Sequence, residues 1–194
     1  MSDSAPEAAL YEGPVVAIPV YAGVSELELG LMLTVCRLCA GDPNGARTVN
    51  RSRASIVTAG GLVTTPQVLY AAMPEPAALL VPGGPGAAKA ARDPLSRAFL
   101  AAHAHLPTGA AGRGLLLLGE AGTLKDREVG GPEDLTDTLW GYGPAQVRAA
   151  DTVTDHQLTT SPGGLRALET ALAVAAALWG QDAAAAADQR IRAG

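Results

Sequence analysis

The sequence predicts a single α/β domain built on a doubly wound, mostly parallel sheet with helices on its faces. Short apolar runs alternate with helical segments along the chain, which is the order expected of β-α-β units. One run, Val15–Tyr21, is apolar throughout, as a strand buried on both faces requires. With 194 residues, 48% of them hydrophobic, the chain can bury one substantial core.

Strands are expected where a short apolar or β-rich run ends in a turn. The first is Val15–Tyr21, and the central one is Ala78–Val81, which is followed directly by Pro-Gly-Gly. A strand of small residues is expected to end just before Gly112. The remaining strands are expected at Thr48–Ser52, Ser55–Val57, Val147–Val153 and Gln157–Thr160.

Helices are expected where a capping residue precedes an apolar periodic segment. Ser25 is a suitable N-cap for Glu26–Cys39, and the turn Gly41–Gly45 ends that helix. Asp93 caps a second helix, which has Pro94 at its first position. This helix runs to about His105, and others are expected at Gln67–Ala72, Leu115–Ala121, Pro132–Leu139 and from the Ser161–Gly164 turn to Trp179.

The two ends of the chain differ in composition from its centre. Residues 1–13 form a loose, polar leader, residues 14–180 form the domain, and residues 181–194 form an alanine-rich tail that extends the last helix or frays. The leader has no basic region and no long apolar run, so it is not expected to be a signal peptide. No stretch reaches the ~20 apolar residues of a membrane helix, so we expect a cytoplasmic protein.

Charge and cysteine content exclude several classes of partner. The net charge is −5 and there is no run of Lys or Arg, which argues against nucleic acid and anionic membranes as partners. The two cysteines, Cys36 and Cys39, fall inside an apolar helical segment without a second pair to complete a zinc site. They are interpreted as buried structural thiols, with a redox or metal role as the alternative. No cofactor and no metal site is indicated.

The segment from Leu106 to Gly122 has the pattern of a nucleophile elbow. A strand of small residues, a tight glycine turn and an apolar helix follow one another, as in enzymes that hold a Ser or Cys on a strained turn. Backbone N–H groups at such a turn can stabilise an oxyanion. Here the residues at the apex are Gly112 and Arg113, and neither is a nucleophile.

Four segments together resemble the ThiJ/PfpI superfamily, which includes isonitrile hydratases and PfpI-type proteases. They are Val15–Leu29, Gly60–Pro66, Ala78–Gly84 and the elbow, where Gly112–Leu118 is similar without a gap to the family's Cys-Thr-Gly-Ala-Leu-Leu-Leu. The resemblance implies a flavodoxin-like, class I glutamine amidotransferase-like fold. It also implies a homodimer, because the family commonly pairs.

In that family an acidic residue on the first helix, the elbow nucleophile and often a histidine meet at one edge of the sheet. The ungapped match places Glu28 at the acidic position and Gly112 at the nucleophile position. Pro132 falls where the histidine would be. The three histidines lie elsewhere in the chain and are interpreted as surface residues: His103, His105 and His156.

The backbone donors of such an elbow are expected to persist without a nucleophile. Glycine at position 112 removes most of the conformational strain of the turn, which fits a site that no longer performs covalent catalysis. The N–H groups of Gly84 and Arg113, beside Gly83, and the start of the helix from Gly114 form a potential anion nest. The Arg113 guanidinium either joins this nest or points outward to a dimer partner or solvent.

Three functions are consistent with these residues. The first is non-covalent binding of a small anionic or carbonyl-type ligand at Gly83, Gly84 and Gly112–Gly114. The second is hydratase, lyase or cyclase chemistry with Glu28 as general acid and base. The third is a protein-interaction or regulatory module.

Overall fold

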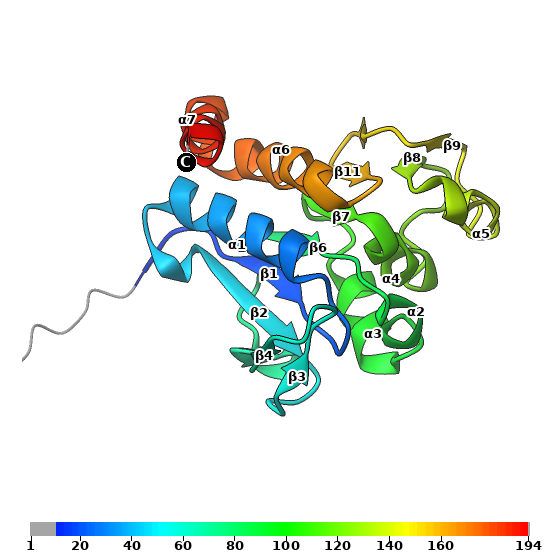
Figure 1. Cartoon of the computed structure of the whole chain (residues 1–194), viewed down its shortest axis with the longest axis horizontal. Helices are drawn as coiled ribbons and strands as arrows, with labels where there is room; N and C mark the ends of the chain where they lie inside the picture. Colours follow the sequence, from blue (N-terminus) through cyan, green and yellow to red (C-terminus); the bar gives the residue numbers. More distant parts are fainter. Residues whose placement is uncertain (1–10, 194) are drawn as a thin grey trace, which may run out of the picture.

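A computed structural model of the chain describes residues 11–193 and contains a seven-stranded central sheet (Figure 1). Residues 1–10 of the expected leader, and Gly194, lie outside the described residues. The strands of the sheet, in spatial order, are β10 (Val153–Asp155), β11 (Leu158–Ser161), β7 (Thr108–Ala111), β6 (Ala78–Val81), β1 (Val16–Pro19), β2 (Ala46–Asn50) and β5 (Val68–Leu69). Within this sheet all pairs except β10–β11 are parallel, which confirms the predicted fold class.

Helices cover both faces of the sheet. The α-helices are α1 (Glu26–Ala40), α2 (Ala87–Ala90), α3 (Pro94–Ala102), α4 (Leu115–Glu120), α5 (Thr136–Trp140), α6 (Ala167–Trp179) and α7 (Gln181–Ala193). Helices α1 and α6 pack on each other over one face, while α2, α3 and α4 cluster on the other (Figure 1). The four residues of β1 and of β6 are completely buried between these layers, as the apolar run at Val15–Tyr21 predicted.

The signals for the start and end of α1 act as predicted. The Ser25 hydroxyl accepts a hydrogen bond from the Glu28 N–H at 3.4 Å. Gly41 ends the helix in the left-handed conformation with φ 66°. These two residues fix the direction in which α1 leaves β1, and therefore where the Glu28 side chain points.

Two predicted elements are wrong, and contacts between distant segments explain both. Gln67–Ala72 was expected to be helical, but β5 pairs with β2 there and a 3-10 turn follows at Tyr70–Ala72. The Gln67 side chain accepts a hydrogen bond from the Thr48 N–H at 2.9 Å, which holds this segment at the edge of the sheet.

The single strand expected at Val147–Val153 is two strands. Ala150 adopts a left-handed conformation with φ 61° and separates β9 (Gln146–Ala149) from β10. Strand β9 pairs in parallel with β8 (Glu128–Gly131), which no sequence pattern indicated. A further two-stranded sheet is the antiparallel hairpin of β3 (Ile56–Val57) and β4 (Val63–Thr64).

The tail belongs to the domain and does not extend the preceding helix. Gly180, with φ 90°, ends α6, and residues from Gln181 form the separate helix α7. This helix packs against α6 and α1, and the Cys39 thiol donates a hydrogen bond to the Ala183 carbonyl at 3.5 Å. Among residues 11–193, no helix combines the length and apolar character needed to cross a membrane.

Candidate functional site

The elbow has the expected backbone geometry. Strand β7 ends at Ala111, Gly112–Gly114 form one 3-10 turn, and α4 follows directly. Gly112 is buried and adopts φ 52°, a left-handed conformation that costs a residue with a side chain roughly 1–3 kcal/mol. The turn is therefore retained, while the residue at its apex carries no reactive atom.

The backbone of the loop after β11 lies directly against Gly112. A Cβ atom at position 112 would stand 3.4 Å from the Cα of Gly163, and one at position 163 would stand 2.7 Å from the Cα of Gly112. The same Cβ at 112 would also lie 3.1 Å from the Oε1 atom of Glu28. Glycine at both positions thus allows two chain segments and a carboxylate to meet at the elbow.

Glu28 is the only acidic side chain that is buried among residues 11–193, with 6% of its surface exposed. Its Oε2 atom accepts a hydrogen bond from the Gly83 N–H at 2.6 Å, and its Oε1 atom accepts one from the Gly164 N–H at 2.8 Å. The carboxylate therefore joins α1 to the turn after β6 and to the loop after β11. Sequence reasoning assigned Gly163 and Gly164 only to a helix start and missed this contact.

The Pro-Gly-Gly turn is shaped to bring backbone donors close to the carboxylate. A Cβ atom on Gly83 would stand 2.7 Å from the Arg113 nitrogen and 3.0 Å from Oε2 of Glu28. Gly84 adopts φ 135°, which essentially only glycine tolerates. Within residues 11–193, neither the Gly84 N–H nor the Arg113 N–H donates to a protein acceptor. Both donors of the predicted nest are therefore without a protein acceptor.

The Arg113 side chain is held away from that nest. Its guanidinium forms an ion pair and hydrogen bond with Asp134, which lies in the 3-10 turn Glu133–Leu135. Arg113 also lines a cavity of about 270 Å³ between α2, α4 and α5. Of the two orientations left open by the sequence, the structure has the outward one, with an acidic partner in the same chain.

A larger cavity lies at the same edge of the sheet as the elbow, where β1 and β2 end. It has a volume of about 440 Å³ and is lined by Tyr21 and by three basic residues, Arg51, Lys89 and Arg92, with Asp93 as the acidic member. The buried Tyr21 hydroxyl donates to the Pro82 carbonyl at 2.7 Å. Burial and, secondarily, the nearby Glu28 carboxylate raise the pKa of Tyr21 well above its usual value. This cavity was not expected from the sequence.

The histidines do not complete a catalytic set at the elbow. His103, the C-cap of α3, is half-buried, contrary to the expected surface position, because its ring packs on Phe99 and its Nδ1 atom contacts the Phe99 carbonyl at 2.7 Å. His105 and His156 are exposed and lie at the opposite end of the sheet. Pro132 follows β8 directly, so no imidazole stands there.

The cysteines lie on α1. Cys36 is completely buried, and burial raises its pKa to about 12. Cys39 is partly buried and its pKa is also raised by burial. No group of three or more His, Cys, Asp or Glu side chains within residues 11–193 is arranged to hold a metal ion.

We expect both thiols to react slowly in the folded protein. Only the thiolate is nucleophilic, and a raised pKa lowers the thiolate fraction at neutral pH. Iodoacetamide at pH 7.5 should label neither Cys36 nor Cys39 appreciably until urea is added, as measured by intact-mass spectrometry. Stoichiometric labelling of Cys36 within minutes under native conditions would contradict the buried position of its thiol.

The fold and elbow define a class I glutamine amidotransferase-like domain, and comparison with solved structures identifies the family. A ThiJ/PfpI family protein from Pseudomonas syringae has a TM-score of 0.80 and 26% identity, over 99% of this chain and 81% of that one. The chain belongs to the ThiJ/PfpI superfamily. By sequence, no family model and no curated protein matches it.

More distant structures share the fold. DJ-1beta of Drosophila melanogaster has a TM-score of 0.83 at 18% identity, covering 92% of this chain and 97% of that one. A ThiJ/PfpI domain protein from Brachyspira murdochii has a TM-score of 0.74 at 14% identity, covering 85% and 95%. These similarities extend over most of the domain described above.

Proposed function

We propose that the chain binds a small anionic or carbonyl-type ligand non-covalently at the elbow. The observation that carries this proposal is the combination of Gly112, which offers no nucleophile, with the open N–H donors of Gly84 and Arg113. Two backbone N–H groups of this kind suit an oxygen atom that carries negative charge or a carbonyl dipole. The protein is thus a degenerate relative of the covalent enzymes, similar in its first strand to isonitrile hydratases.

The Glu28 carboxylate favours a carbonyl compound over an anion at the innermost position. Its Oε1 atom lies 3.1 Å from the position that a Cβ atom at residue 112 would occupy. A ligand with a carbonyl oxygen and a polar hydrogen, such as an amide, satisfies both the N–H donors and this acceptor. An anionic ligand is better served by Arg51, Lys89 and Arg92 in the cavity where β1 and β2 end.

Titrations of the isotopically labelled protein with acetamide and with acetate test this proposal. Acetamide is expected to shift the amide resonances of Gly83, Gly84 and Gly112–Gly114, and Gly112→Ala is expected to weaken its binding. Gly122→Ala is the matched control, because Gly122 also has a positive φ of 77° and has no neighbouring atoms within 4 Å of its Cβ position. Elbow resonances that do not respond to either compound would contradict the proposal.

A second candidate function is acid–base catalysis by Glu28, as in a hydratase, lyase or cyclase. The specific observation in its favour is that the carboxylate is buried beside the ligand position and pairs with no cationic side chain of residues 11–193. A screen of amides, nitriles and hydroxy acids for turnover tests it. Loss of turnover in Glu28→Gln and retention in Glu26→Gln is the expected result, whereas equal activity of the two variants would exclude Glu28 as the catalyst.

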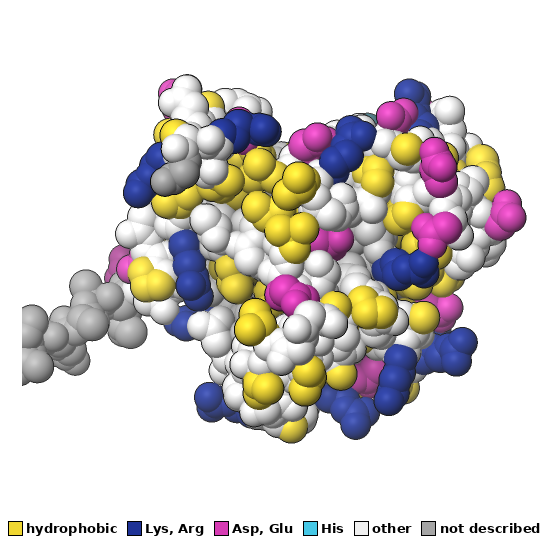
Figure 2. Space-filling view, in the orientation of Figure 1, with side chains coloured by type: hydrophobic (Ala, Val, Ile, Leu, Met, Phe, Trp, Pro, Cys, Tyr) yellow, Lys and Arg dark blue, Asp and Glu magenta, His cyan; other side chains and the backbone are white. Residues whose placement is uncertain are grey.

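We infer further that two copies of the chain pair through the surface formed by α1, α7 and the loop before α6. Apolar side chains gather on this surface (Figure 2), and Leu27 and Leu165 are 47% and 74% exposed. A mostly apolar groove of about 490 Å³ runs between α1 and α7. Exposed apolar patches of this kind mark interaction surfaces, and a second copy agrees with the pairing common in the family.

Leu27→Arg is expected to convert this homodimer to a monomer, because it places a charge in an apolar contact. Light scattering coupled to size-exclusion chromatography should then change from twice the chain mass of 19.5 kDa to that mass. Leu95→Arg is the control, since Leu95 is similarly exposed at 56% but lies on α3 at the other face. A parent protein that is already monomeric at micromolar concentration would refute the pairing.

A further inference from the structure

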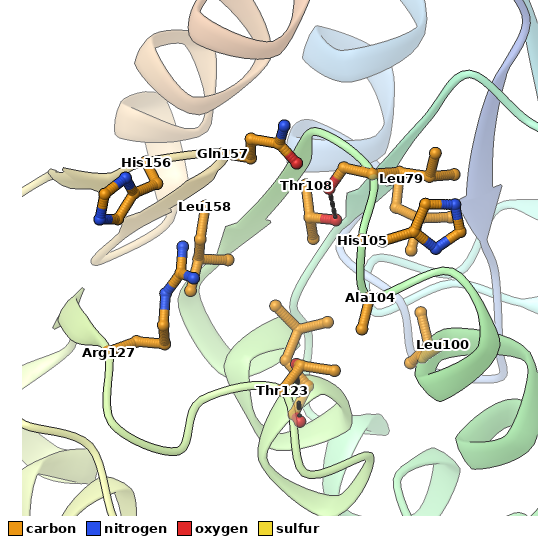
Figure 3. Close-up of a pocket in the computed structure, with 12 residues that line it drawn as sticks. Leu79, Leu100, Ala104, His105, Thr108, Thr123, Arg127, His156, Gln157 and Leu158 are labelled. Carbon is orange, nitrogen blue, oxygen red and sulfur yellow. Dashed lines mark hydrogen bonds between the residues drawn. The ribbon is translucent and has the colours of Figure 1, made fainter.

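Another cavity lies at the opposite edge of the sheet from the elbow. It has a volume of about 430 Å³ and opens where β6, β7 and β11 begin, at Leu79, Thr108 and Leu158 (Figure 3). Ligands of parallel sheets usually bind at the carboxyl ends of the strands, where the elbow lies. This cavity is therefore separate from the site proposed above.

The floor of the cavity is apolar and buried. Four leucines form it, each at most 5% exposed: Leu79, Leu100, Leu118 and Leu158. Leu100 comes from α3 and Leu118 from α4, so the cavity lies between the sheet and the helices of one face. Its size falls within the range of ordinary small-molecule sites, roughly 300–1,000 Å³.

The rim carries hydrogen-bond donors from three separate segments. His105 follows α3, Arg127 precedes β8, and His156 and Gln157 form the turn between β10 and β11; Figure 3 shows these side chains around the cavity. Among residues 11–193, the His105 and Gln157 side chains have no protein hydrogen-bond partner, and the exposed His156 ring has its Nε2 atom 3.6 Å from Oδ1 of Asp155.

Arg127 is the cation of this rim, and one acidic residue holds it in place. Its Nη2 atom donates to the Asp155 carbonyl at 2.5 Å, and its Nε atom lies 3.0 Å from Oδ2 of Asp155 without hydrogen-bond geometry. The Nη1 atom has no hydrogen-bond acceptor among residues 11–193. One edge of the guanidinium is therefore fixed and the other is open for a ligand.

Strained turns present two of these rim residues. His156 adopts φ 54° and Asp126, next to Arg127, adopts φ 60°, both in the left-handed region, which few residues with side chains enter and which Asp and His enter more often than others. Glycine would be the usual choice for a two-residue hairpin turn such as the one at His156. Conformations of this kind persist where the surrounding structure requires them, and they cluster at ligand sites.

We propose that this cavity binds a small monocarboxylic acid with an apolar body. The body packs on the four leucines, and the carboxylate accepts hydrogen bonds from the open edge of Arg127 and from the imidazole or amide donors of the rim. Asp155 neutralises part of the local charge, so a single carboxylate fits this site better than a multiply charged anion.

Titration with phenylacetate tests the proposal, with phenylacetamide as the neutral compound of the same shape. Phenylacetate is expected to bind saturably and to shift the amide resonances of residues 104–108, 123–127 and 156–158. Arg127→Gln should weaken it about tenfold or more, the loss expected of one charge-assisted hydrogen bond. Arg148→Gln, which removes an exposed arginine paired with Glu128, is the matched control and should leave the affinity unchanged.

His156→Gly is the second test variant, for use if Arg127→Gln perturbs folding. Glycine relieves the left-handed strain and removes the imidazole, so this variant should melt at or above the parent temperature while binding phenylacetate several-fold more weakly. Equal affinities for phenylacetate and phenylacetamide would overturn the proposal. So would resonance shifts that scatter over the surface without saturating, or parental affinity in both Arg127→Gln and His156→Gly.

Discussion

Glu28→Gln is expected to lower the free energy of unfolding by roughly 2–4 kcal/mol, measured by urea denaturation. Both carboxylate oxygens accept hydrogen bonds from backbone N–H groups, of Gly83 and Gly164. An amide side chain keeps one acceptor and turns its NH₂ group toward the other N–H donor. That donor is then buried without an acceptor, and the remaining hydrogen bond loses its charged partner.

Glu26→Gln is the matched control for this result. Glu26 and Glu28 both lie in the first turn of α1, so both favour the helix dipole. Glu26 makes no hydrogen bond or ion pair within residues 11–193, and its substitution should change stability by less than about 0.5 kcal/mol. Equal losses in the two variants would show that Glu28 acts through the dipole and does not hold the three segments together.

Gly84→Ala is expected to cost about 3 kcal/mol or more, because conformational strain and overlap add. Gly84 has φ 135°, and a Cβ atom there would stand 2.3 Å from the Gly23 carbonyl oxygen and 2.6 Å from the Ser25 nitrogen. All these atoms belong to backbone, so a change of rotamer cannot relieve the overlap. The turn after β6 would have to move away from the start of α1.

Gly122→Ala separates the two contributions. Gly122 shares the positive φ, at 77°, but a Cβ atom there would meet nothing within 4 Å. Its substitution should cost only about 1–2 kcal/mol, the penalty for a side chain in the left-handed region. The melting temperatures of the two variants provide the comparison. A Gly84→Ala protein as stable as Gly122→Ala would mean that the turn after β6 moves away from α1 at little cost in free energy.

Local patterns predicted the elements that local residues determine. Ser25 and Gly41 mark the ends of α1, and the apolar run at Val15–Tyr21 predicts a buried strand, because each signal acts within a few residues. The elbow could be predicted for the same reason. The run of small residues before Gly112 and the leucines after it are contiguous in the sequence.

Contacts between distant segments could not be predicted in this way. The Gly164 N–H reaches Glu28 across 136 positions, and the pairing of Arg113 with Asp134 depends on the 3-10 turn Glu133–Leu135 that follows β8. The strand at Val68–Leu69 exists because β2 lies beside it. In each case the partner is specified by the packing of the sheet, which no single segment encodes.

Glycine at position 112 also has a consequence for the chemistry of oxidants. A cysteine at a strained, donor-rich turn has thiolate character and is the residue most exposed to peroxide. The chain has only Cys36 and Cys39, and both lie on α1 with raised pKa values. The elbow itself therefore has no thiol whose oxidation could change its shape or charge.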